Sequence, residues 1–157
     1  MIFQPEPDDS LYVSRLDASE LLGTVSDHSF QLEDRIWPTV EHYIQAMQFS
    51  DEARQENIRL AKDHMVARKL GKTGLFRRAR ADWSDLRRVY MTRGVYTKAR
   101  SYSDVADALL ETGSIRIIEN DQYDYYWGCG RDRRGDNTYG KILMEVRQKL
   151  RDEVAAR

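Results

Sequence analysis

The clearest pattern along the chain is a helical stripe of hydrophobic residues within positions 37–49. Its members recur at i, i+3, i+4 and i+7, the spacing of one helix face, and they are Val40, Tyr43, Ile44 and Met47. Thr39 is placed to cap this helix, because its hydroxyl can accept a hydrogen bond from a free backbone N–H of the first turn. Glu41 and Gln45 fall on one flank of the stripe. The pattern therefore predicts a carboxylate in the first turn, at the edge of a buried face. This carboxylate either takes part in catalysis or only stabilises the start of the helix.

The other elements follow from the same kind of pattern. Period-two alternation predicts strands within residues 12–16, 29–33 and 115–119. Capping residues predict helices over residues 51–62, from Asp63 to Gly71, from Asp82 onward and from Ser103 to about residue 111. The helix after Asp82 is expected to bury Leu86, Val89 and Tyr90, and a final helix carries Ile142, Val146, Leu150 and Val154 on one side. The fold class is α+β, a compact, predominantly helical single domain over residues 1–157 with a few short strands.

Composition narrows the class of protein. The chain has 157 residues, 41% hydrophobic and 32% charged, with a formal net charge of -1, which fits a folded chain and not a thoroughly basic one. A single cysteine, Cys129, excludes an intrachain disulfide and fits a reducing compartment. Residues 1–9 do not resemble a signal peptide, and no hydrophobic run approaches the roughly 20 residues that span a bilayer. We expect a cytoplasmic protein that does not associate with a membrane.

Several common kinds of site are absent from the sequence. The three histidines, His28, His42 and His64, lack the paired spacing of metal ligands, and one cysteine cannot form a thiolate cluster. Gly71 stands before a lysine and a threonine, as at the end of a phosphate loop, but the earlier glycine of that motif is missing. We expect neither a metal nor an organic cofactor.

The segment from residue 120 to 139 is polar and aromatic and contains several glycines. It holds Asp124 and Trp127 among three tyrosines, and such rings can stack on a nucleobase. A glycine such as Gly128 lets backbone approach a phosphate or ribose closely. Asn137 precedes the last helix, whose free N–H groups could hold an anion. An aromatic turn packed on the core and an ordinary helix cap are the alternatives.

Taken together, five stretches resemble the YbiA-like N-glycosidases of the NADAR superfamily, named for NAD and ADP-ribose. They occur in the family's order, and they are Trp37-Pro38-Thr39-Val40-Glu41-His42-Tyr43, Arg80-Ala81-Asp82-Trp83, Leu109-Leu110-Glu111-Thr112-Gly113, Asp124-Tyr125-Tyr126-Trp127-Gly128-Cys129-Gly130 and the segment from Asn137 to Arg147. Two features depart from the family. Its Phe-Ser-Asn-Phe-type element is not found in residues 10–25, and its Lys-Phe pair is Lys98-Ala99.

The resemblance implies cleavage of an N-glycosidic bond to a ribose that carries phosphate or ADP. The family's functional residues map by motif onto Glu41, Trp83 and Asp124. A carboxylate can stabilise the positive charge that develops on the sugar and orient water, which we assign to Glu41. A second acid can assist the leaving group, which we assign to Asp124. The candidates for substrate binding are Trp37, His42, Gln45, Arg80, Lys98, Trp127, Gly128 and Asn137. Arg80 and Lys98 are the phosphate candidates, and Lys98 can also be a Schiff-base amine or a surface lysine.

Three functions remain open. The leading one is removal of ADP-ribose from guanine bases in nucleic acid, and the second is hydrolysis of ribosylaminopyrimidine phosphates of riboflavin biosynthesis. The third is a non-catalytic ADP-ribose or NAD binding module, which has little use for two acids. A basic run over residues 68–80 and the nearby Arg131, Arg133 and Arg134 favour a polyanionic partner, although such runs are also typical of a solvated face. The oligomeric state stays open.

Overall fold

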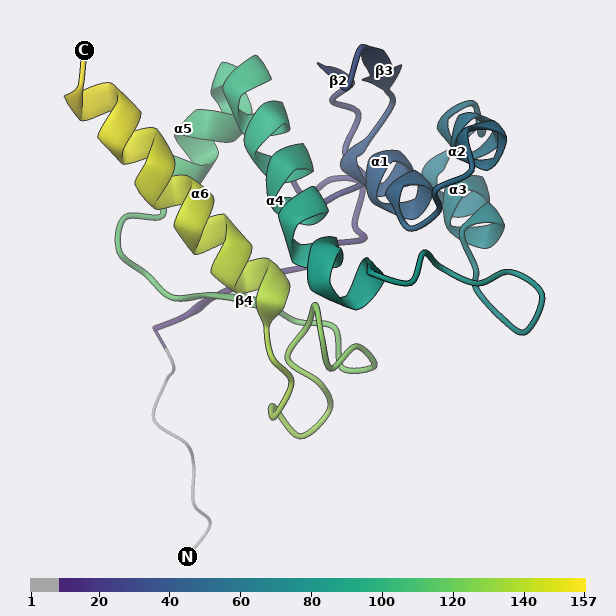
Figure 1. Cartoon of the computed structure of the whole chain (residues 1–157). Helices are drawn as coiled ribbons and strands as arrows, with labels where there is room; N and C mark the ends of the chain where they lie inside the picture. The colour runs from purple at the N-terminus through teal and green to yellow at the C-terminus, as the bar shows by residue number, and fades with distance from the viewer. Residues whose placement is uncertain (1–8) are drawn as a thin grey trace, which may run out of the picture.

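A computed structural model describes residues 9–157, and this part of the chain forms six helices and four short strands (Figure 1). The strands are β1 (Leu11–Val13), β2 (Phe30–Leu32), β3 (Arg35–Trp37) and β4 (Ile117–Glu119). The helices are α1 (Val40–Met47), α2 (Glu52–Arg59), α3 (His64–Leu70), α4 (Trp83–Ser101), α5 (Ser103–Glu111) and α6 (Thr138–Ala155). The predicted α+β class with dominant helices is confirmed. The first eight residues, which carry most of the segment judged for a signal peptide, lie outside the described range.

Two strands that are far apart in the sequence lie side by side. β1 pairs in parallel with β4, with Leu11 opposite Ile117 and Val13 opposite Glu119. Because the strands are parallel, both end at the same edge, and the chain leaves both at that edge as loops. Helix α6 packs along β4 and covers it (Figure 1).

The second pair is a hairpin that the sequence analysis found only in part. β2 was predicted, but β3 was not. The two-residue turn between them is Glu33-Asp34, and both residues have positive φ, 55° and 60°. Such a turn normally contains Asn-Gly, which tolerates this backbone without a steric penalty. Ile36 in β3 also points to solvent with 61% of its surface exposed, so the usual strand signals are missing.

Helix α1 lies between α4 on one side and α2 and α3 on the other (Figure 1). The Thr39 hydroxyl accepts a hydrogen bond from the His42 N–H at 3.1 Å, so the predicted cap is confirmed. The predicted stripe is also buried, since Val40, Tyr43, Ile44 and Met47 are at most 4% exposed. The core around α1 therefore fixes the orientation of every side chain in its first turn.

Helix α4 buries the predicted face only in part. Tyr90 packs against the core and Leu86 is half-buried, but Val89 is 52% exposed, while Met91 and Val95 are buried. Gly94 lies on the buried face, because a Cβ there would lie 3.1 Å from the Tyr43 ring. The glycine lets α4 approach α1 closely, and the helix continues to Ser101. In α6 the predicted face is buried except for Val154, which is 56% exposed near the helix end.

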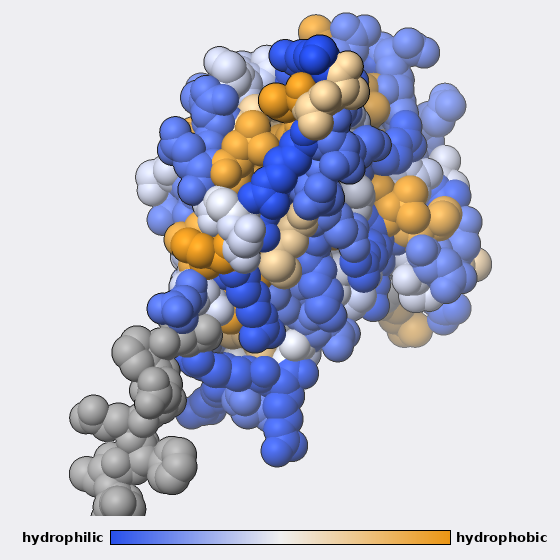
Figure 2. Space-filling model, turned by 90° about the vertical axis from the view of Figure 1, so that its left-hand side faces the viewer, coloured by the Kyte–Doolittle hydropathy of each residue, from blue (hydrophilic) through white to orange (hydrophobic). Residues whose placement is uncertain are grey.

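The surface shown in Figure 2 is mostly hydrophilic, with hydrophobic residues in small separate patches. Small scattered patches are ordinary on a protein surface and do not define a docking site. Within residues 9–157, none of the helices combines the length and hydrophobicity that crossing a bilayer requires.

Candidate active site

A single buried arginine joins the two carboxylates that the sequence analysis singled out. Arg15 follows β1, and its side chain is only 6% exposed. Its Nη1 lies 3.5 Å from Glu41 Oε2, and its Nη2 lies 3.5 Å from Asp124 Oδ2. Because the guanidinium is a rigid fork, the two carboxylate oxygens are at most about 9 Å apart. Two acids at this separation can flank one glycosidic bond.

Glu41 is fully buried, contrary to the expectation that it lies at the edge of the helix face. Its side chain is 1% exposed. The Thr24 hydroxyl donates to Oε2 at 2.7 Å, and Gln45 Nε2 donates to Oε1 at 2.9 Å. Arg68 Nε lies 3.6 Å from Oε1. A buried carboxylate is tolerated only with such partners, which also fix its orientation. Gln45 therefore holds Glu41 in place, whether or not it also contacts substrate.

Asp124 is held by the loop that follows β4. Its Oδ1 accepts hydrogen bonds from the backbone N–H groups of Tyr126, at 2.9 Å, and Trp127, at 2.7 Å. This leaves Oδ2 for Arg15, and 27% of the side chain stays accessible. The loop thus presents one carboxylate oxygen toward Arg15, with its position set by backbone hydrogen bonds.

Glu119, at the end of β4, is a third buried acid that the sequence analysis read only as part of a strand. It accepts hydrogen bonds from the backbone N–H of Arg15 and of Asp121, both at 3.1 Å. Burial raises the pKa of this carboxyl. A Cβ at Gly128 would lie 2.6 Å from Glu119 Oε2, so the packing here requires glycine. This contact is sufficient to explain a glycine at position 128.

Asn137 also has a structural position. Its Oδ1 accepts from the backbone N–H of Glu119 at 2.8 Å, and its Nδ2 donates to the Ile117 carbonyl at 2.9 Å. The first N–H groups of α6 donate to the carbonyls of Tyr126 and Trp127. The expected anion site at the start of this helix is therefore already filled by the protein's own backbone.

Two further candidates for substrate binding lie inside the protein. Trp37 is 0% exposed, and its Nε1 donates to the Leu32 carbonyl at 3.0 Å. His42 has Nδ1 2.8 Å from the Thr39 hydroxyl and Nε2 3.1 Å from the Ala61 carbonyl. Burial lowers the pKa of His42, which favours the neutral ring. Both side chains are thus buried around the start of α1, with their polar atoms bonded within the protein.

Lys98 is neither a surface lysine nor free to bind phosphate. It is 3% exposed, and its Nζ donates to the carbonyls of Leu21 and Gly23, at 2.8 and 2.9 Å, and to Ser26 Oγ at 2.6 Å. Burial lowers its pKa to about 8. These bonds hold the segment that carries Thr24, whose hydroxyl contacts Glu41.

The remaining candidates lie at the start of α4 and in the aromatic loop. Trp83 stacks on Tyr90 with ring centroids 6.0 Å apart, and Arg80 Nε donates to Asp82 at 2.6 Å. Trp83 is one helical turn before Arg87, whose guanidinium lies over the Tyr126 ring in the loop after Asp124. Trp127 is half-buried with its ring against Tyr126. Arg80 is thus paired within the protein, whereas Trp83 lies on the helix face that contacts the Asp124 loop.

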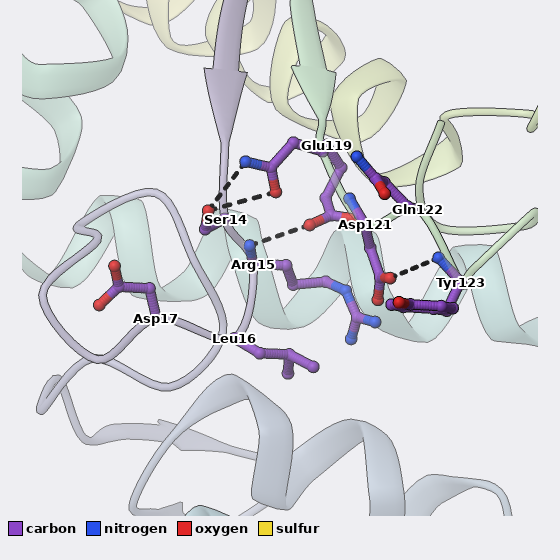
Figure 3. A pocket seen from close by; sticks show the side chains of 9 residues that line it. Ser14, Arg15, Leu16, Asp17, Glu119, Asp121, Gln122 and Tyr123 are labelled. Carbon is purple, nitrogen blue, oxygen red and sulfur yellow. Dashed lines mark hydrogen bonds between the residues drawn. The ribbon is translucent and has the colours of Figure 1, made fainter. Parts of the chain in front are cut away.

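An open pocket of about 450 Å³ lies where β1 and β4 end. Figure 3 shows Arg15 extending across it from the β1 side toward Tyr123. Loops at the carboxyl ends of parallel strands are a common location of ligand sites. The lining residues are Ser14, Arg15, Leu16, Asp17, Glu119, Asn120, Asp121, Gln122 and Tyr123. Among residues 9–157, no group of three or more histidine, cysteine, aspartate or glutamate side chains is arranged to hold a metal ion.

Two oriented carboxylates close to each other, beside an open pocket, are compatible with a glycosidase site. The chain belongs to the NADAR domain family, whose match covers residues 2–151. It is 36% identical over 130 residues to an N-glycosidase from Nostoc punctiforme, covering 81% of this chain and 83% of that protein. It is 32% identical over 120 residues to the N-glycosidase YbiA of Escherichia coli, covering 76% of this chain and 74% of YbiA.

The fold agrees with this assignment. The solution structure of Escherichia coli YbiA superposes with a TM-score of 0.85 at 28% identity, covering 98% of this chain and 91% of YbiA. A chloroplastic riboflavin biosynthesis protein of Zea mays is 34% identical over an alignment of 145 residues that covers 83% of this chain and 23% of the longer plant protein. The predicted family is confirmed, and the protein is an enzyme of the N-glycosidase class.

Proposed function

We propose that this NADAR-family N-glycosidase removes ADP-ribose from guanine bases in nucleic acid. The observation that carries the reaction type is the attachment of Glu41 and Asp124 to one guanidinium, Arg15. In the proposed reaction, water adds to C1′ of the ribose, the C1′–N bond breaks, and the base nitrogen gains a proton. The water gives up a proton as it adds, so the net reaction is hydrolysis.

Each acid has a distinct position for this work. Glu41 is buried and fixed by Thr24 and Gln45, which suits a charge that stabilises the developing cation on the sugar and orients water. Asp124 is partly accessible, which suits contact with the leaving base or a ribose hydroxyl. Arg15 offsets the mutual repulsion of the two carboxylates when both are ionised.

A basic, exposed segment supports a nucleic-acid substrate over a small one. Arg68 of α3 contacts Glu41, and the connection from α3 to α4 continues with the exposed Arg77 and Arg78. The same connection presents Phe76, which is 93% exposed. Cations that track a phosphate backbone, together with an exposed ring on which a base can stack, are the usual parts of a single-strand surface.

The second candidate is hydrolysis of ribosylaminopyrimidine phosphates. The similarity to the Zea mays riboflavin biosynthesis protein favours it. The same pair of carboxylates suits either reaction, because both break a bond between C1′ and nitrogen. The two candidate substrates differ in the groups attached to the ribose. The functions are therefore distinguished by which substrate the enzyme hydrolyses.

Turnover of the two substrates provides the test. The purified protein is incubated with an oligonucleotide that carries ADP-ribose on guanine and, separately, with a ribosylaminopyrimidine phosphate, and the released sugar is quantified by chromatography. Glu41→Gln should abolish release, whereas Glu52→Gln, at an exposed position on α2, should leave it unchanged. Turnover of the small substrate alone would refute the leading proposal in favour of the second. No turnover of either, with tight ADP-ribose binding, would leave only a binding module.

A further inference from the structure

The connection between α3 and α4 displays the one pair of neighbouring large hydrophobic side chains that is strongly exposed within residues 9–157. Leu75 is 74% exposed, and Phe76 is 93% exposed. Contiguous exposed hydrophobic surface, unlike a single exposed residue, usually marks a place where a partner binds. The pair is small in area, so the kind of partner has to be inferred from the backbone that holds it and from the charges around it.

The backbone holds this pair at the tip of a tight turn. Gly74 and Arg77 form an antiparallel bridge, in which the N–H of each residue donates to the carbonyl of the other, at 2.9 and 3.2 Å. Leu75 and Phe76 are the two residues between them, so both side chains lie at the end of the turn. A segment whose backbone is already fixed loses less entropy when it binds than a flexible one does.

Both ends of the connection are anchored on Gln48, the last residue of the α1 turn. Its side-chain Nε2 donates to the Gly71 carbonyl, and its own carbonyl accepts from the N–H of Arg80 at 2.8 Å. The same Nε2 donates to Gln45 Oε1 at 2.9 Å, and Gln45 donates in turn to Glu41. The turn therefore projects from a base that two glutamines link to the carboxylate assigned to the reaction.

The two ends of the connection also lie next to the two sides of the proposed active site. At the end that follows α3, Arg68 lies 3.6 Å from Glu41. At the other end α4 begins, and its Arg87 lies over the ring of Tyr126, in the loop that holds Asp124. Figure 1 shows the connection as a loop that projects from the body of the protein between α3 and α4. A partner bound to the turn is therefore held at the edge of the site.

Unpaired cations flank the hydrophobic tip. Lys72 precedes it, Arg77 and Arg78 follow it, and all three are exposed. Among residues 9–157, none of the three has an acidic partner, whereas Arg80 at the base is paired with Asp82. Residues 64–81 contain no aspartate or glutamate at all. Cations without a local counter-ion suit a polyanionic partner.

Two kinds of partner suit cations around a hydrophobic tip, an anionic membrane surface and a nucleic acid. The link to the active site favours the nucleic acid, because the proposed reaction acts on a base. Glu41 is 1% exposed, so a base edge that stays inside a duplex cannot come into contact with it. Enzymes that act on a base within a duplex meet this difficulty by moving the nucleotide out of the stack.

We propose that Leu75 and Phe76 form a wedge that enters the base stack of a duplex beside the modified guanine, while the flanking cations contact the phosphates. Leucine and phenylalanine are among the side chains that proteins insert between base steps, and a leucine has no flat face for stacking on a single strand. The proposal rests on the proposed function. It adds that the substrate can be a duplex, which the enzyme opens, so that the freed strand is single-stranded where it meets the site.

A fluorescent base reports the opening directly. 2-Aminopurine is placed next to one guanine of a duplex, either plain or carrying ADP-ribose, because its emission is quenched in the stack and rises when the stack opens. Glu41→Gln, which should leave bound substrate intact, should raise the emission severalfold. Adding Leu75→Ser and Phe76→Ser should abolish the rise at saturation and weaken duplex binding by about tenfold or more, since one stacked ring alone contributes that much.

Two controls separate the wedge from the charges and from exposed hydrophobic surface in general. Ile36→Thr replaces a hydrophobic residue of β3 that is 61% exposed, and it should leave both binding and emission unchanged. Lys72→Gln should lower the slope of the salt dependence by about one, with the emission of the bound duplex unchanged. Because all the replaced side chains are exposed, the variants should keep the fold and the unfolding midpoint of the parent protein.

The proposal is overturned if the protein does not bind the duplex, if it binds without a rise in emission, or if the serine variant opens the duplex as the parent does. It is also overturned if the serine variant loses binding to phosphatidylserine vesicles and keeps binding to the duplex, since the turn would then be a membrane contact. The outcome is separate from the test of the proposed function. Opening that depends on the wedge, without release of ADP-ribose, would refute that function alone, whereas release from guanine without opening would refute the wedge alone.

Discussion

Replacing Lys98 by methionine separates a structural role of this amine from a chemical one. The change keeps the length of the side chain and removes three hydrogen bonds, to Leu21, Gly23 and Ser26. Each bond from a charged donor contributes about 1.5–3 kcal/mol, and the cost of burying the ammonium offsets part of the total. We expect Lys98→Met to lower the free energy of unfolding by about 2–4 kcal/mol, measured by urea denaturation.

The stability of the protein should also change with pH, in a direction that the pKa of Lys98 sets. Burial lowers the pKa of Lys98 from 10.5 to about 8, so above pH 8 the folded state binds fewer protons here than the unfolded state. The stability of the wild type should therefore rise from about pH 8 to pH 10, by at most about 3 kcal/mol. Near pH 10 unfolded tyrosines begin to ionise, while burial raises the pKa of Tyr43 and Tyr139 in the folded state, so the gain is then opposed. Lys98→Met should lack the rise.

Turnover by the wild type and by Lys98→Met is compared as well. Loss of the Lys98 bonds frees the segment that carries Thr24, so turnover should fall together with stability. Lys62→Met, at an exposed position, is the matched control and should change neither property. A Lys98→Met protein as stable as the wild type, with the same pH profile and no turnover, would refute the structural role. It would indicate an amine that reacts with the opened ribose.

Two further predictions concern the carboxylates and the basic connection. If Glu41 and Asp124 act as a unit on one bond, Glu41→Gln combined with Asp124→Asn should lower kcat/KM scarcely more than the more damaging single change, and additive losses would contradict this. Reversing the charge of Arg77 and Arg78 should weaken binding of an ADP-ribosylated oligonucleotide and lower the slope of its salt dependence by about one per lost phosphate contact, with turnover of a small ribosylated substrate unchanged. Equal effects on both substrates would argue against a nucleic-acid surface.

Local patterns in the sequence predicted the elements that have local causes. Thr39, Asp51 and Asp63 each cap the helix that follows, because a short polar side chain can accept from the N–H groups of its own first turn. Asp82 shows the limit of this reasoning, since it makes no cap hydrogen bond and pairs with Arg80 instead. A nearby cation competed for the carboxylate, and spacing along the chain does not reveal such competition.

For some candidate binding residues, burial and internal hydrogen bonds favour a supporting role that the sequence could not reveal. His42 and Asn137 stand in stretches that resemble the family's motifs, and the structure shows both bonded to backbone or to a cap. A motif marks residues that the site requires, and many of them are required because they support the structure around the site. Only the partners of each polar atom distinguish a residue that supports the site from one that faces a ligand.

Arg15 could not be predicted because its position depends on contacts made through the backbone. Its N–H donates to Glu119, and its carbonyl accepts from the N–H of Thr24 at 2.8 Å. Such contacts place few constraints on the side chain, so they produce no motif. The N-terminal wall of the site is built in this way, without the Phe-Ser-Asn-Phe-type element that the resemblance led us to look for.

This construction has a consequence for the reaction. The backbone of residue 15 is fixed between β4 and the Thr24 segment, and from there the Arg15 side chain reaches both Glu41 and Asp124. Arginine here supplies one positive charge to two acids, and it also lines the open pocket at the ends of β1 and β4. Replacing Arg15 should therefore lower turnover, because it removes the shared partner of both carboxylates and leaves their mutual repulsion uncompensated.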